Sequence, residues 1–146
     1  LEQVLDAGRR APSASNRQEW RFVVVTEEKL RSQMMAAASN QRFVGEAPVV
    51  IACCAETDHH HMRCGLECFA IDVAIAIDHI TLAAVAEGLG SCWIGAFDAN
   101  QVKEILGVPE EIVVVELLTL GYPEDPSEKE KNRKSLDEIV RYEGWE

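Results

Sequence analysis

The sequence predicts a layered domain of the α/β or α+β class. Segments rich in β-branched and aromatic residues alternate along the chain with segments of helical periodicity. Apolar residues make up 47% of the 146 residues and charged residues 27%, which is typical of a globular domain. The chain shows no internal repeat and no composition break, so we assign residues 1–146 to a single domain.

The first half of the chain predicts two helix–strand pairs. Residues 1–10 carry apolar residues at helical spacing, and Pro12 ends that helix. Residues 20–26 read WRFVVVT and predict a strand, which precedes a helix over 27–38 with Thr26 as a possible cap. Residues 47–55 form a continuous apolar run led by a proline, as in a strand buried on both faces.

The second half begins with a helix that is apolar on nearly every side. This helix spans residues 66–88 and follows a connecting segment of mostly polar residues over 56–64. Its apolar surface places it at the centre of the fold or of a dimer. Gly88 and Gly90 are candidates for its C-terminal cap. The remaining predicted elements are a strand over 91–95, a helix over 99–106, a strand over 112–123, a charged loop, and a helix over 135–142 with a Ser135–Glu138 capping box.

Charge and cysteine content narrow the class of protein. The formal net charge of -11 argues against nucleic acid and against anionic lipid as partners. The apolar stretch within 69–90 is interrupted by polar and charged residues, which predicts a buried helix rather than a membrane span. Five irregularly spaced cysteines do not form a disulfide framework, and no signal peptide is visible, so we expect a cytoplasmic protein.

Short polar side chains gather between the first helix and the first strand. Ser13, Ser15, Asn16 and Gln18 fall within six positions. Such residues usually satisfy local backbone groups in a loop. Neutral donors and acceptors are also what a flat heteroaromatic ligand with ring carbonyls and N–H groups requires. Both interpretations stay open at this point.

Two further segments fit either a ligand-binding role or an ordinary structural role. Gly95 and Ala96 follow a strand, where small residues either let the backbone approach a ligand or make a tight turn. Lys131, Arg133 and Lys134 precede a helix start in an acidic chain. These cations suit a phosphate group, although most such runs are solvated surface.

A metal site is a weaker interpretation. His59, His60 and His61 are adjacent, and Cys64 and Cys68 are one helical turn apart, yet no CxxC or HxxxH pair is present. The chain also lacks a P-loop, a dinucleotide-binding glycine pattern, a GxSxG motif and a legible nucleophile–base pair. If the protein is an enzyme, a cofactor is expected to carry the chemistry.

Four segments in order resemble the nitroreductase family of flavin enzymes. APSASNRQEW resembles the Pro-Ser-x-x-Asn-x-Gln-Pro-Trp segment of that family, and NQRFVGEAPVVI resembles the stretch that leads into its second strand. AIDVAIAIDHITLAAVAEGLGSCWIGAFD looks like its long central helix and flavin-facing turn, and NRKSLDEIVRYEGW like its C-terminal phosphate-contacting segment. The chain departs from the pattern at Glu19, where the family usually has proline, and nothing in it matches the Arg-Arg-Ser-x-Arg segment that grips the FMN phosphate. We expect that segment to lie upstream of Leu1.

The resemblance implies a nitroreductase-like fold with a mixed sheet flanked by helices, in an intertwined homodimer with FMN at the interface. It assigns the flavin-lining role to a set of residues, with the loop contributed by the partner subunit. The flavin lies against Pro12, Ser13, Ala14, Asn16 and Gln18, its pyrimidine edge against Asn40 or Gln41, its central ring against the backbone of Ile94 and Gly95, and its phosphate against Arg133 and Lys134.

The function implied is an FMN-dependent oxidoreductase that passes hydride from NADH or NADPH to a nitro compound, quinone or similar small acceptor by a ping-pong route. No side chain is assigned a catalytic role. Two alternatives remain from the sequence: a flavin-binding or flavin-processing module without redox function, and a metal-binding or interaction protein built around His59–His61 and the cysteines.

Overall fold

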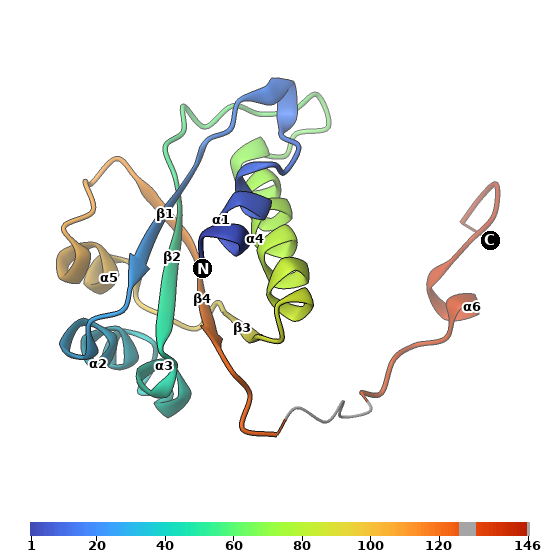
Figure 1. Cartoon of the computed structure of the whole chain (residues 1–146). Helices are drawn as coiled ribbons and strands as arrows, with labels where there is room; N and C mark the ends of the chain where they lie inside the picture. Colours follow the sequence, from blue (N-terminus) through green and yellow to red (C-terminus); the bar gives the residue numbers. More distant parts are fainter. Residues whose placement is uncertain (126–130, 146) are drawn as a thin grey trace.

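A four-stranded sheet lies at the centre of the computed structural model, which describes residues 1–125 and 131–145. The strands lie in the order β1-β2-β4-β3 and comprise β1 (Trp20–Val25), β2 (Val49–Ala55), β3 (Gly90–Ile94) and β4 (Val113–Gly121). Helices α1 (Glu2–Arg9) and α4 (Cys68–Ala86) cover one face, and α2 (Glu28–Ala37), α3 (Arg42–Glu46) and α5 (Ala99–Leu106) cover the other (Figure 1). The predicted layered α+β fold is confirmed.

Every strand pairing in the described residues is antiparallel, so the expectation of a mixed sheet is not met within this chain. Val25 at the end of β1 lies opposite Val50 near the start of β2. Two helices, α2 and α3, connect these strands and return the chain to the same end of the sheet. A parallel neighbour would have required the connection to cross to the opposite end.

Strand β2 is the buried centre of the sheet, as its continuous apolar run predicted. Six of its seven residues are buried. Cys53 packs into the core shared with α1 and α4, whereas Cys54 packs into the core on the opposite face. The two thiols therefore cannot share a metal ion, because successive side chains along a strand point to opposite faces of the sheet.

Helix α4 lies against the sheet but leaves apolar residues in solvent. By length and composition it could cross a membrane, with a mean hydropathy of 1.9, yet 44% of its most apolar window is buried inside the chain. It begins at Cys68, two residues later than predicted, because the preceding residues form a loop closed by a bridge between His61 and Glu67. Cys64 is in this loop and not one helical turn before Cys68. Gly88 follows the helix with a φ of +73°, in the role predicted for it.

The structure corrects two local predictions and adds one short helix. Thr26 does not cap α2, whose N-cap residue is Glu27 and which has no side-chain cap. Residues 42–46 form α3, a short helix for which the sequence offered no distinct signal. The last helix, α6 (Leu136–Ile139), is only four residues long, although the capping box is present and Glu138 Oε2 accepts the Ser135 N–H at 2.9 Å.

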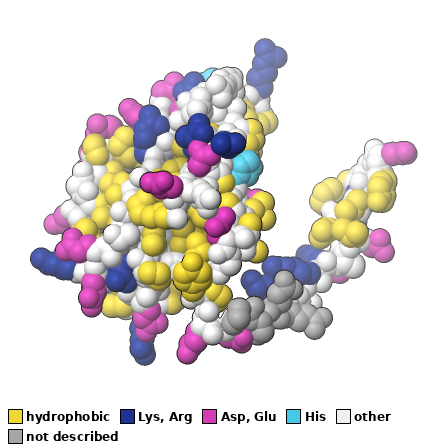
Figure 2. Space-filling view, in the orientation of Figure 1, with side chains coloured by type: hydrophobic (Ala, Val, Ile, Leu, Met, Phe, Trp, Pro, Cys, Tyr) yellow, Lys and Arg dark blue, Asp and Glu magenta, His cyan; other side chains and the backbone are white. Residues whose placement is uncertain are grey.

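The short length of α6 follows from its surroundings. Most helical stability comes from packing of an apolar face, and Leu136 and Ile139 are 72% and 62% exposed. Residues 131–145 extend away from the body of the chain (Figure 1). Figure 2 shows apolar side chains gathered on this segment in solvent.

Candidate functional site

The loop that joins α1 to β1 has an unusual backbone. We refer to residues 12–18 as the polar loop. Ser15, Asn16 and Gln18 have φ values of 50°, 55° and 53°, in the left-handed region that residues other than glycine seldom adopt. Backbone in this region costs free energy and persists only where the surroundings enforce it, which is common at ligand sites.

Hydrogen bonds within the polar loop account for some of its polar groups. The backbone N–H of Gln18 donates to Ser13 Oγ at 3.1 Å, and Gln18 Nε2 donates to the carbonyl of Asn16 at 3.2 Å. Ser13 and Gln18 therefore satisfy local backbone groups of the loop, as the first of the two interpretations expects. Ser15 and Asn16 are exposed, and their side chains form no hydrogen bond within the described part of the chain. These two side chains remain available to a ligand.

Asp72 ties the polar loop to the central helix. Both of its carboxylate oxygens lie 3.1 Å from the backbone nitrogen of Ala14, which donates to them. Asp72 projects from the first half of α4 and is only 4% exposed. A buried carboxylate that receives a backbone N–H is a strong anchor, so the position of the loop depends on α4.

Glu19, where the nitroreductase pattern has proline, forms a buried polar network. Its carboxylate lies 3.2 Å from Arg17 Nη2 and accepts from the Cys68 thiol at 3.5 Å. Burial acts to raise the pKa of Glu19, but hydrogen bonds from Arg17, Thr57 and Cys68 outweigh it and hold that pKa below its usual value. Arg17 also forms an ion pair with Asp58, so one guanidinium holds two carboxylates. Glu19 thus holds the end of the polar loop through its ion pair with Arg17, whereas a proline at this position would restrict the backbone through its ring.

A second group of predicted residues meets at the turn after β3. Gln41 Nε2 and Ser39 Oγ both donate to the carbonyl of Ala96, at 3.3 and 3.5 Å. Gly95 and Ala96 are exposed, and within the described residues their backbone N–H groups donate no hydrogen bond. Asn40 is adjacent to this contact and also exposed. The structure therefore brings Asn40 and Gln41 together with Ile94 and Gly95.

The polar loop and this turn lie far apart in one chain. Through the sheet register, Ile94 is level with Val23 of β1, three strand spacings or roughly 14 Å away. Trp20 lies three residues further along β1, roughly 10 Å from Val23, and the polar loop precedes it. The two halves of the predicted site do not meet within a single chain.

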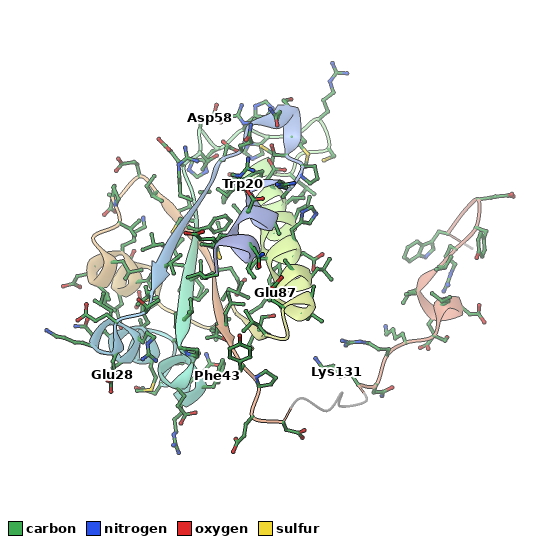
Figure 3. The ribbon with its side chains drawn as sticks, viewed as in Figure 1. Trp20, Glu28, Phe43, Asp58, Glu87 and Lys131 are labelled. Carbon is green, nitrogen blue, oxygen red and sulfur yellow. The ribbon has the colours of Figure 1, made fainter. Side chains whose placement is uncertain are left out.

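Arg133 and Lys134 are separate from both halves. They are exposed and lie on the segment that extends away from the body, next to Lys131, which Figure 3 labels. Neither forms an ion pair with a described residue. Their cationic groups are available to an anion.

The histidine cluster does not assemble a metal site with the cysteines. His59 Nδ1 lies 3.2 Å from Glu67 Oε2, and His61 Nε2 lies 3.8 Å from Glu67 Oε1; both histidines are exposed and Glu67 is partly buried. Cys64 is exposed on the same loop but forms no group with them. These contacts hold the loop before α4 closed.

The potential metal ligands that do converge among the described residues are Glu19, Cys68 and Asp72, whose ligand atoms lie within 4.8 Å of one another. All three are buried and already have partners. Arg17 pairs with Glu19, the Cys68 thiol donates to Glu19, and the Ala14 N–H donates to Asp72. These three residues thus belong to the hydrogen-bond network that supports the polar loop.

Comparison with known proteins decides the family. The sequence profile described as "Nitroreductase family" matches residues 1–122. The chain belongs to the nitroreductase family. A protein of Archaeoglobus fulgidus named "Putative NADH dehydrogenase/NAD(P)H nitroreductase" is 33% identical, over 99% of this chain and 85% of its own length.

Solved structures support the nitroreductase fold. A nitroreductase family protein from Clostridium novyi NT superposes with a TM-score of 0.80 at 36% identity, covering 87% of this chain and 75% of that one. The NADPH:FMN oxidoreductase of Vibrio harveyi, solved with NAD+, superposes with a TM-score of 0.88 at 28% identity. That alignment covers 99% of this chain and 67% of the Vibrio protein. The predicted family and fold are thus confirmed.

Proposed function

We propose that this nitroreductase binds FMN and acts as an NAD(P)H-dependent flavin oxidoreductase. When bound, FMN supplies the redox chemistry: its N5 accepts hydride from NADH or NADPH, and two electrons then pass to a nitro compound, quinone or similar small acceptor in a ping-pong cycle. Relatives named "FMN reductase [NAD(P)H]" in Bacillus subtilis and "NADPH-flavin oxidoreductase" in Vibrio harveyi support this reaction class.

The turn after β3 is the observation that carries the proposal. Two exposed backbone N–H groups at Gly95 and Ala96 lie beside the amide of Gln41, with no side chain at Gly95 to cover them. Such groups donate hydrogen bonds to a ring that gains electron density on reduction, without reorganising. Asn40 and Gln41 suit the carbonyl and N–H groups of the pyrimidine edge. Neutral donors and small residues of this kind fit a flavin ring.

The remaining roles follow from the exposed groups of the other segments. Asn16 of the polar loop binds the ring from the other side, together with the amide oxygen of Gln18, whose Nε2 already donates within the loop. Pro12, Ser13 and Ala14 shape the loop around the ring. Arg133 and Lys134 bind the phosphate, because guanidinium and ammonium groups pair strongly with it.

The site requires a second copy of the chain. The polar loop and the 94–96 turn are separated within one chain, so a homodimer brings the loop of one subunit to the turn of its partner. Apolar side chains that a dimer would bury include Leu82 and Val85 on α4, which are 63% and 68% exposed, and Trp145 at 89%. Leu82 and Val85 are three residues apart and so share one face of α4, and exposed apolar residues grouped in this way are typical of an interface. The five cysteines are free thiols, in keeping with a cytoplasmic location.

The first test is the visible spectrum of the protein with FMN, before and after anaerobic addition of NADH and then NADPH. A flavin band that bleaches with either nucleotide is the expected result. Flavin that binds but resists both donors would indicate a flavin-binding module without redox function. A protein that stays colourless with excess FMN would contradict the proposal.

Site assignments are tested by affinity. Asn16→Ala should weaken FMN binding measured by fluorescence quenching, whereas Gln33→Ala, which removes an exposed amide from α2, should not. Arg133→Ala should weaken FMN about tenfold or more but leave riboflavin unchanged, because only FMN carries the phosphate. Arg42→Ala removes an exposed charge elsewhere and serves as the control. Equal losses for both ligands would remove Arg133 from the phosphate site.

A further inference from the structure

Strand β4 carries a carboxyl group directly beside the proposed flavin-binding turn. Glu116 lies opposite Cys53 of β2, on the face of the sheet that α4 covers. A Cβ atom built at Gly95 would be 3.6 Å from Glu116 Oε1 and 3.8 Å from Oε2. The Glu116 carboxyl therefore lies next to the turn at Gly95, within van der Waals range of it. This is the turn against which we place the flavin.

This carboxyl is incompletely satisfied. Glu116 Oε1 is buried and has no hydrogen-bond partner among the described residues. An ionised carboxylate oxygen at this position loses the free energy of hydration and gains no hydrogen bond in return. A protonated carboxyl loses less, so burial favours the protonated form of Glu116. Burial raises the pKa of Glu116, and the backbone N–H of Ile94 acts in the opposite direction without cancelling the effect.

The elements packed around Glu116 supply no compensating cation. From β2 the facing group is the Cys53 thiol, whose own pKa burial raises well above the usual value. The nearest titratable group on β3 is the exposed thiol of Cys92. Helix α4 presents apolar residues to this core, among them Ile77 and Ile80. Within the described residues, a change of charge near the 94–96 turn is therefore felt by Glu116 without screening from a neighbouring ion pair.

We propose that Glu116 is a positioning residue that couples flavin reduction to uptake of a proton by the protein. The inference rests on the proposed function. Hydride from NAD(P)H adds two electrons and one proton to the flavin, which leaves negative charge on the ring. That charge favours the neutral form of Glu116, so its carboxylate takes one proton from solvent, forming an O–H bond on a carboxylate oxygen. Reoxidation by the acceptor reverses this step and returns the proton.

The proposal predicts a specific pH dependence. The pKa of Glu116 is higher with reduced flavin than with oxidised flavin. At pH values between these two pKa values, the protein binds one proton for every two electrons, in addition to the proton that the flavin takes up. Outside that interval the extra proton disappears. A residue with a merely structural role changes stability or affinity but not the number of protons bound.

The experiment is a redox titration of the FMN-loaded protein at a series of pH values above 4.5, the ordinary carboxyl value, because burial raises the pKa of Glu116. Wild type is compared with Glu116→Gln, which keeps the side-chain shape, and with Glu111→Gln, which removes an exposed carboxylate just before β4. We expect wild type and Glu111→Gln to bind the additional proton over part of the range, and Glu116→Gln to bind none.

Carboxyl 13C NMR of wild-type protein gives a measurement that does not depend on a variant or on turnover. In protein without FMN, the Glu116 carboxyl should titrate above the ordinary value of 4.5. In FMN-loaded protein it should titrate at higher pH when the flavin is reduced. Identical titrations in both flavin states, or identical proton uptake by wild type and Glu116→Gln, would overturn the inference alone. Wild type that fails to bind FMN would instead overturn the proposed function, and this inference with it.

Discussion

Replacing Glu19 by glutamine tests the network that supports the polar loop. Glutamine keeps the shape of the side chain and removes its charge. The carboxylate lost lies 3.2 Å from Arg17 Nη2 and is 5% exposed, so little water is available to replace it. A hydrogen bond to a charged group contributes about 1.5–3 kcal/mol. The substitution also removes repulsion from Asp72, whose ligand atom lies within 4.8 Å. That relief offsets part of the loss, because two buried carboxylates repel each other.

The net expectation is a loss of about 1–2 kcal/mol in the free energy of unfolding at neutral pH, because the lowered pKa of Glu19 shows that its partners stabilise the ionised form overall. For a chain of this size, that corresponds to a fall of roughly 2–8 °C in Tm. Thermal unfolding followed by far-UV circular dichroism measures it. Glu56→Gln is the matched control, because its carboxylate lies 2.6 Å from Arg21 but both groups are exposed. Exposed pairs of this kind contribute about 0–1 kcal/mol.

The pH dependence of the loss identifies its cause. The pKa of Glu19 is lowered in the folded state, so its contribution is fully present above the unfolded value, 4.5, and is lost as the pH falls through the folded value. Wild type and Glu19→Gln should therefore converge in stability as the pH falls below the usual carboxyl value and Glu19 becomes protonated. A variant as stable as wild type at neutral pH, or a loss that does not change with pH, would refute the reasoning.

Three further predictions concern packing, capping and assembly. Gly8→Ala should destabilise the chain by about 1–2 kcal/mol in urea unfolding, because the new Cβ would lie 2.7 Å from Ile80 Cγ1 in the core; unchanged stability would show that α1 shifts freely. Asp98→Ala should cost about 1 kcal/mol, since its carboxylate caps α5 by accepting two backbone N–H groups at 3.0 and 3.1 Å, whereas the exposed Asp78→Ala should cost less than half of that. Leu82→Asp should convert a dimer to monomer in analytical ultracentrifugation and abolish FMN binding; a variant that stays dimeric would remove this face of α4 from the interface.

Much of the fold was predictable from local pattern. The apolar run over 47–55 identified a strand buried on both faces, because only a central strand presents apolar residues to two layers. The apolar helix over 66–88 was found within two residues at each end, since its composition leaves no other location for so much apolar surface. Helix α3 was missed because five residues carry too little periodicity to separate a helix from a loop.

The candidate site was predictable only in part. The residue types of the polar loop and of the turn after β3 indicated neutral donors in both segments. Their left-handed backbone, the anchor from Asp72 and the pairing of Glu19 with Arg17 were not, because each depends on contacts between segments distant in sequence. Glu116 carried one signal, a lone carboxylate within the apolar run of β4, but its proximity to Gly95 required the register of β3 and β4.

The sequence by itself determined the family, the class of fold and the order of its elements, because these follow from periodicity, composition and motifs that are local to the chain. The tertiary structure decided which polar groups have partners and which remain free. It also decided that the two halves of the candidate site lie apart within one chain. Strand register and helix packing set these distances, and both are collective properties of the core that no single segment specifies.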